Sequence, residues 1–278
     1  MLRHHFTVDV EEYFQVSALE PFVARTEWAT RQSRVTAGVR ELLDLMNAAS
    51  ATGTFFVLGW LAERRPELVR AIAGAGHEIA SHGWDHRRVT DQTPAEFRDS
   101  ARRSKRELED ITGAAVMGFR APSFSIVPGR EWALDILAEE GYRYDSSLFP
   151  VRRPGGHYGY PGGRRDPHWL DRPSGRLGEM PPATLDLCGF RLPAGGGAYF
   201  RLFPYALVRA ALHACAVRGV PGTFYIHPWE LDPEQPRLPV GWATRVRHYG
   251  GLARTVPRLR RLLQEFRFTA IKETMGTL

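Results

Sequence analysis

The sequence has few of the residues that mark several large classes of protein. It contains two cysteines, Cys188 and Cys215, which are too few for a disulfide framework and lack metal-ligand spacing, so we expect two partly buried free thiols. No stretch approaches the roughly 18 consecutive apolar residues that a membrane-spanning helix needs. The N-terminus has neither the apolar region nor the small-residue cleavage site of a signal peptide, so a cytoplasmic protein is expected.

Lysine is almost absent, although the chain is basic, with a net charge of +6. It occurs only at Lys105 and Lys272, so all but two of the 37 Lys and Arg residues are arginine. The arginines are scattered along the chain and form no basic block, and we therefore expect no nucleic-acid partner. The charge is compatible with attraction to an anionic glycan or membrane surface.

The length and the order of predicted elements indicate one α/β domain over residues 1–278. Hydrophobic residues make up 43% and charged residues 24% of the chain, which is the balance of a globular protein. Segments rich in β-forming residues alternate with segments of helical periodicity, and a parallel sheet with helical crossovers is therefore expected, either open or closed into a barrel. The expected strands are 4–10, 54–59, 77–82, 116–120 and 142–145, and the expected helices are 36–51 (with Thr36 as N-cap), 66–75, 94–112 (with a capping box from Thr93) and 130–140.

This alternation is interrupted between residues 150 and 182, where Pro and Gly are frequent. A structureless loop of that length would be unusual in a compact domain, so an ordered insertion on the rim of the fold is expected. After it we expect short strands near 184–192, a helix over 204–218, a strand over 222–227, a helix over 255–266 and a last strand over 268–272. Residues from about 231 onward form a C-terminal extension in this interpretation.

Polar residues follow several of the predicted strands directly. Asp9 and Glu11 stand two apart at the end of the first strand, so their carboxylates share a face, although a pair of solvated loop acids would look the same. His82 and His86 stand four apart after the third strand and could meet one metal ion on a turn, a pattern that is weak by itself.

Two further polar positions complete the set. Arg120 follows the fourth strand and could brace a carboxylate through a bidentate pair, and His227 ends the strand over 222–227. Parallel strands place their carboxyl ends at one edge, where α/β barrels carry their active sites. The conjunction predicts a metal site together with an acid and a base.

These clusters resemble the motifs of the polysaccharide deacetylase family, also called the NodB-homology or carbohydrate esterase family 4 group. Residues 7–11 (TVDVE) resemble its first motif, 81–86 (SHGWDH) the second, 120–124 (RAPSF) the third and 225–227 (YIH) the last. They occur in the family's order and span most of the chain. The segments DVEEYF, FRAPSFSI, YDSSLFP, GGGAYFR and FYIHPWEL are similar to the branch found with exopolysaccharide and exosortase gene systems.

The resemblance implies a distorted seven-stranded (β/α) barrel, that is, a (β/α)7 barrel, with metal-dependent N-deacetylase activity on an N-acetylated sugar of an exopolysaccharide or its precursor. The sequence departs from the family pattern in one place, because the usual adjacent aspartates are replaced by Asp9 and, two positions later, Glu11. This puts metal affinity and metal choice in question. One divalent ion is expected, Zn²⁺ first, with Co²⁺ or Ni²⁺ as alternatives.

The resemblance also implies a role for each candidate residue. Glu11, His82 and His86 are the expected metal ligands. The expected catalytic residues are Asp9 as general base, Arg120 holding Asp9, His227 as the acid that protonates the leaving amine, and Asp145 as a weaker candidate for orienting His227. The expected sugar-binding walls are Trp84, Phe124, Tyr199 and Trp229.

Two other functions fit the same residues. One is a metal-free amidohydrolase of the allantoinase-like type, in which the His pair binds substrate. The other is a catalytically inactive glycan-binding protein. The expected partner is an N-acetylated glycan, and peripheral contact with membrane-bound glycan machinery is compatible with this interpretation.

Overall fold

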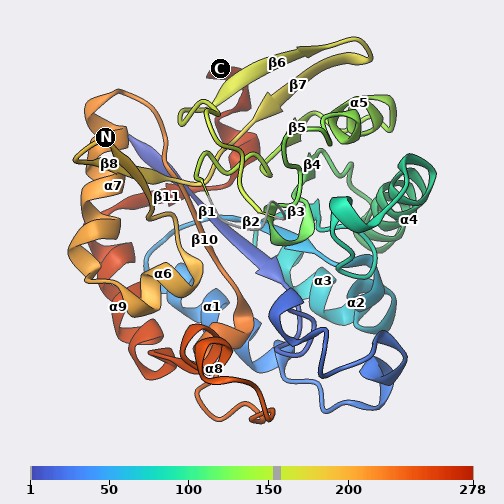
Figure 1. Ribbon diagram of the computed structural model, residues 1–278, viewed down its shortest axis with the longest axis horizontal. Helices are drawn as coiled ribbons and strands as arrows, with labels where there is room; N and C mark the ends of the chain where they lie inside the picture. Colours follow the sequence, from blue (N-terminus) through green and yellow to red (C-terminus); the bar gives the residue numbers. More distant parts are fainter. Residues whose placement is uncertain (1, 153–157, 278) are drawn as a thin grey trace.

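The computed structural model describes residues 2–152 and 158–277, and its centre is a sheet of nine strands covered by helices (Figure 1). The strand order is β10-β1-β2-β3-β4-β5-β7-β6, and β11 also pairs with β1. The sheet consists of β1 (Arg3–Val10), β2 (Thr54–Val57), β3 (Glu78–Ser81), β4 (Gly118–Phe119), β5 (Tyr144–Asp145), β6 (His168–Arg172), β7 (Gly175–Glu179), β10 (Thr223–Ile226) and β11 (Arg267–Thr269). A separate hairpin pairs β8 (Thr184–Leu187) with β9 (Phe190–Pro193).

The strands from β10 through β7 run parallel to their neighbours, and only β6 joins antiparallel, as a hairpin with β7. The chain just past β7 then returns to β10, because Pro182 forms a parallel bridge with Thr223 and the Ala183 N–H donates to the Thr223 carbonyl at 2.9 Å. This contact brings the two ends of the parallel series together. The distorted (β/α) barrel expected from the sequence is therefore confirmed.

The helices lie on the outside of the strands (Figure 1). They are α1 (Val35–Ala48), α2 (Gly59–Arg64), α3 (Pro66–Gly74), α4 (Pro94–Thr112), α5 (Trp132–Glu139), α6 (Gly197–Leu202), α7 (Tyr205–Val217), α8 (Trp242–Tyr249) and α9 (Thr255–Glu265). Apolar residues at helical spacing face the sheet, for example Val39, Leu42 and Met46 of α1, each fully buried. Burial of these faces supplies the main stabilising free energy of such a fold.

The predicted start of α4 is confirmed. The Glu96 N–H donates to the Thr93 hydroxyl at 3.3 Å, and the Glu96 carboxylate accepts from the Thr93 N–H at 2.8 Å, which is a capping box.

The predicted start of α1 is wrong. The helix begins at Val35, and the Glu12 carboxylate, 22 residues earlier than Arg34, accepts from the Arg34 N–H at 2.9 Å. A cap from a distant side chain leaves no local signal.

Several elements are absent from the sequence-based prediction. The strand expected over 54–59 ends at Val57, and Gly59 already begins α2. The sequence also does not predict helices α6 and α8. The same is true of the β6–β7 hairpin, which lies within the expected insertion. Cys215 is buried but Cys188 is exposed, which corrects the expectation of two partly buried thiols. Among the described helices, none combines the length and hydrophobicity that crossing a bilayer requires.

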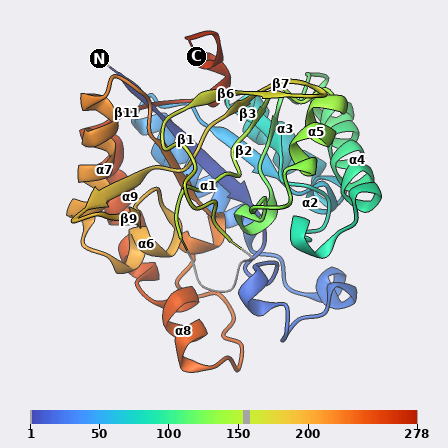
Figure 2. The same cartoon turned by 45° about the horizontal axis from the view of Figure 1, so that its top comes forward.

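Two segments outside the barrel lie at the end toward which β1 runs. Both views show α8 and the segment that follows β1 at this end, and the β6–β7 hairpin at the opposite end (Figures 1 and 2). The carboxyl ends of the parallel strands therefore open toward α8, and the polar residues that follow those strands gather there.

Candidate metal centre

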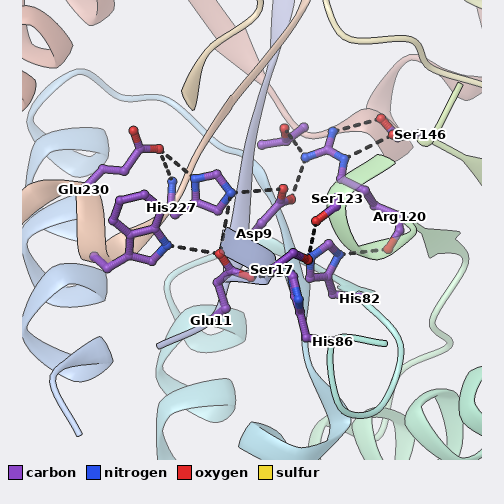
Figure 3. Close-up of polar contacts among 12 residues, drawn as sticks. Asp9, Glu11, Ser17, His82, His86, Arg120, Ser123, Ser146, His227 and Glu230 are labelled. Carbon is purple, nitrogen blue, oxygen red and sulfur yellow. Dashed lines mark hydrogen bonds and ion pairs between the residues drawn. The ribbon is translucent and has the colours of Figure 1, made fainter. Parts of the chain in front are cut away.

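Glu11, His82 and His86 converge at the carboxyl ends of β1 and β3 (Figure 3). One ligand atom from each lies within 4.8 Å of the others, and all three side chains are buried. His86 reaches the cluster because its backbone takes a left-handed conformation, with φ of 57°, in the turn after β3. The structure thus brings together the three residues predicted as metal ligands.

The hydrogen bonds around the cluster fit a cation. Glu11 Oε2 lies 2.7 Å from His86 Nε2, yet this buried oxygen makes no hydrogen bond within the described part of the chain. His82 Nδ1 lies 2.8 Å from the Arg120 carbonyl, which can only accept, so Nδ1 carries the proton and Nε2 presents its lone pair. A backbone partner of this kind fixes the tautomer of metal-ligating histidines.

The charges fit as well. Burial is the main reason why the pKa of His82 falls to about 4, so its imidazole is neutral at pH 7. Burial alone would raise the pKa of Glu11, but the neighbouring His86, His227 and His82 outweigh it and lower the pKa to about 2. An ionised carboxylate beside neutral imidazole is the donor set of a divalent ion such as Zn²⁺.

Asp9 lies beside this cluster and is held by Arg120 (Figure 3). The fully buried Arg120 guanidinium donates from Nη1 to Asp9 Oδ1 at 2.7 Å and to the Thr7 hydroxyl at 2.8 Å. Its Nη2 donates to the Ser146 hydroxyl at 2.8 Å, and its Nε donates to the Ser146 carbonyl at 3.2 Å. One oxygen of Asp9 is therefore anchored, and Oδ2 faces His227.

His227 lies on the other side, with Nε2 at 3.7 Å from both Asp9 Oδ2 and Glu11 Oε1. Its Nδ1 donates to Glu230 Oε1 at 2.7 Å, and the buried Glu230 carboxylate is paired with the equally buried Arg201 guanidinium. Burial lowers the pKa of His227, but the Glu230 hydrogen bond and the charges of Glu11, Glu230 and Asp9 raise it to about 9. The imidazole is therefore protonated at neutral pH.

Asp145 does not contact His227, which corrects its expected role. Its carboxylate accepts from the Ser147 hydroxyl at 2.6 Å and from the Ser147 N–H at 2.9 Å. Ser147 in turn accepts from the Ala121 N–H at 2.7 Å, so Asp145 supports the turn after Arg120. Glu230 orients His227 instead, and its place three residues after His227 was a local signal. Arg201 left no such signal.

A cavity of about 370 Å³ opens over these residues. Phe124, Tyr199 and Trp229 line it, and their sugar-binding role stays a prediction. Trp229 also donates from Nε1 to Glu11 Oε1 at 3.0 Å and stacks on His248, with ring centroids 4.3 Å apart. Trp229 therefore also holds one of the candidate metal ligands.

Trp84, the other expected wall residue, does not line the cavity. Its ring packs against the backbone of Gly59 so closely that a Cβ atom on this glycine would come within 2.4 Å of the ring. The Arg103 guanidinium covers the ring at 3.3 Å from its centroid. Trp84 therefore packs between α2 and α4 and is not available to a sugar in the cavity.

Comparison with known proteins divides the chain into two parts. A family model described as polysaccharide deacetylase matches residues 30–144. A second family model, described as a domain of unknown function (DUF3473), matches residues 146–276. The match to the deacetylase domain includes His82, His86 and Arg120, whereas His227, Glu230 and Arg201 lie in the second part.

The relatives that match this chain include the peptidoglycan deacetylase of Helicobacter pylori, which is 31% identical over 113 residues. This match covers 40% of the present chain and 37% of that protein, well under two thirds of its length.

Solved structures share the fold over nearly the whole chain. A structure from Mycobacterium smegmatis, described as that of a polysaccharide deacetylase, has a TM-score of 0.65 at 21% identity and covers 99% of this chain and 90% of its own. Puue allantoinase has a TM-score of 0.60 at 18% identity and covers 99% and 89%. At these identities the likeness concerns the fold.

Proposed function

We propose that this chain is a metal-dependent hydrolase that removes N-acetyl groups from an N-acetylated sugar, with an exopolysaccharide or its precursor as substrate. The proposal depends on one observation. A three-residue ligand set lies next to a carboxylate held by an arginine and to a histidine held protonated by a glutamate, and the ligands, this carboxylate and this histidine line one cavity. These are the parts that amide hydrolysis needs: a cation, a base and an acid.

Glu11, His82 and His86 would hold the ion, which when bound polarises the acetamide carbonyl and acidifies a water molecule. Asp9 takes a proton from the attacking water through Oδ2, since Oδ1 is engaged by Arg120. Water oxygen bonds to the carbonyl carbon. His227 then gives its proton to the amide nitrogen as the C–N bond breaks, because the nitrogen cannot leave as an anion. Acetate and the free amino sugar result.

Phe124 and Tyr199 would pack against the sugar ring in this arrangement. The similarity to a peptidoglycan deacetylase supports an N-acetylated sugar as substrate, and the sequence resemblance to the exopolysaccharide branch supports the polymer. Zinc as the ion, a cytoplasmic location and a single domain with an insertion at 150–182 stay predictions.

The metal-free amidohydrolase is the competing proposal, since an allantoinase shares the fold. The deciding experiment measures the metal content of the purified protein by elemental mass spectrometry, in wild type, His82→Ala and the control His213→Ala, which changes an exposed histidine. We expect about one ion per chain in wild type and in the control, none in His82→Ala, and acetate release from N-acetylglucosamine oligomers that follows the metal.

A wild-type protein that takes up no metal after reconstitution would reject the proposal. Turnover of small ureides without metal would establish the amidohydrolase. Glycan binding without any turnover by metal-loaded protein would instead establish the inactive glycan-binding protein.

A further inference from the structure

Arg247 is an arginine of the cavity wall that, unlike its neighbours Arg88 and Arg201, forms no ion pair with a carboxylate of the described residues. Arg88 pairs with Asp91 at 2.7 Å and with Glu20 at 3.2 Å, and Arg201 pairs with Glu230. Arg247 is exposed, and no carboxylate of the described residues lies within ion-pair distance of it.

The backbone of Arg247 is fixed relative to the catalytic histidine. Its carbonyl accepts from Arg201 Nη2 at 2.9 Å, and Arg201 is the residue that pairs with Glu230. The next residue, His248, stacks on Trp229 with a tilt of 22° between the rings. Helix α8 therefore holds the backbone of Arg247 at a set position in the wall of the cavity that His227 also lines.

The guanidinium acts on the cavity side of the helix. Burial raises the pKa of Tyr225, a residue of the cavity wall, and the charge of Arg247 opposes part of that rise. Arg247 and Tyr225 both line the cavity, so the charge of Arg247 lies near the wall that a substrate would meet.

No carboxylate of the site remains to neutralise Arg247. Asp9 is paired with Arg120 and Glu230 with Arg201, and Glu11 would be bound to the ion. A neutral N-acetyl sugar would leave the guanidinium without an ionic partner. In a cavity with low-dielectric walls, an uncompensated cation favours an anionic ligand.

Building on the proposed function, we propose that the substrate carries an anionic group, a carboxylate or a phosphate, adjacent to the N-acetylated sugar, and that Arg247 binds this group. A planar guanidinium recognises either anion through two parallel N–H donors. Arg247 thus selects among N-acetylated glycans and takes no part in the chemical step.

The test compares three substrates on metal-loaded wild type, Arg247→Gln and the control Arg245→Gln, an exposed arginine of the same helix that does not line the cavity. The substrates are neutral chitotetraose, a tetrasaccharide of alternating N-acetylglucosamine and glucuronate, and N-acetylglucosamine 1-phosphate. Arg247→Gln should raise KM about tenfold to a hundredfold for the carboxylate or the phosphate substrate and leave kcat nearly unchanged. Its KM for chitotetraose, and every constant of the control, should change less than twofold.

The anionic substrate whose KM rises in Arg247→Gln identifies the anion. Equal effects of this variant on all three substrates would overturn the proposal. Calorimetric binding of the same three saccharides gives a readout independent of turnover. A preference for an anionic saccharide that Arg247→Gln abolishes would establish the anion site even if no substrate is hydrolysed, in which case the proposed function fails alone. Equal binding of neutral and anionic saccharides would overturn the anion site and leave the proposed function intact.

Discussion

The Asp9 side and the His227 side of the candidate site are built in the same way, with opposite charges. On one side Asp9 is held by Arg120, which is fixed by Thr7 and Ser146, residues of β1 and of the chain just after β5. On the other side His227 is held by Glu230, which is fixed by Arg201. Each side thus has a proton-transferring residue, a partner of opposite charge and an anchor for that partner.

The comparison teaches why burial does not abolish the charges that the chemistry needs. Moving a carboxylate or an imidazolium out of water is costly, and a group without a partner would become neutral instead. Arg120 therefore supplies the counter-charge of Asp9, and the Glu230 carboxylate favours the protonated form of His227. The groups that fix the two arginines differ. Arg120 donates to the chain just after β5, whereas Arg201 donates to backbone carbonyls in and just after α8.

The largest effect is expected where either proton-transferring residue is removed. Asp9→Asn and His227→Gln should each lower kcat for acetate release by about 10²–10⁴-fold, the usual contribution of a general base or acid. Neither residue belongs to the ligand set, so elemental analysis should find the metal retained. Asp9→Asn with more than a tenth of wild-type turnover would show that the two sides are not equivalent.

The next largest effect concerns the stability of the His227 side. Arg201→Met removes one of the two cations paired with the buried Glu230 carboxylate and should lower the free energy of unfolding by about 3–5 kcal/mol, measured by urea denaturation. Arg245→Met on the exposed face of α8 serves as the control and should change it by less than about 0.5 kcal/mol. Equal stability of the two variants would mean that Arg201 does not anchor this side.

A smaller effect is expected on the pH profile. His227 must be protonated to act as an acid, so activity is present below its pKa of about 9 and is lost as pH rises through that value. Glu230→Gln removes one of the charges that raise this pKa, and the alkaline limb should move to lower pH by about one to three units. A bound cation changes the pKa of His227 in wild type and in Glu230→Gln alike, so the difference between their alkaline limbs persists. Asp145→Asn, which lacks contact with His227, should leave the limb in place; movement of the limb in this variant would restore its predicted role.

The smallest effect separates two tryptophans. Trp84→Phe should change KM less than twofold and cost about 0.5–1 kcal/mol of stability through weaker stacking with Arg103. Trp229→Phe removes a hydrogen bond to a candidate metal ligand and should weaken metal affinity about 10–100-fold, measured by competition with a chelator. Similar behaviour of the two variants would contradict their different positions.

The sequence by itself determined most of the alternating strands and helices of the barrel, the capping box of α4 and the residues that follow the strand ends. These features depend on local periodicity and on short-range hydrogen bonds, and parallel strands necessarily bring their carboxyl ends to one edge. Asp9, Glu11, His82, His86, Arg120 and His227 could be selected for this reason, together with the resemblance to known motifs.

Only the tertiary structure decided which side chains become partners. Glu12 caps α1 from another segment, Pro182 brings the barrel back to β10, and Arg201 reaches Glu230 across 29 residues. Trp84 and Trp229 both follow strand ends, yet one packs between helices and the other lines the cavity. Periodicity reports whether a residue is buried, whereas its partner depends on distant segments whose approach is set by packing of the whole barrel.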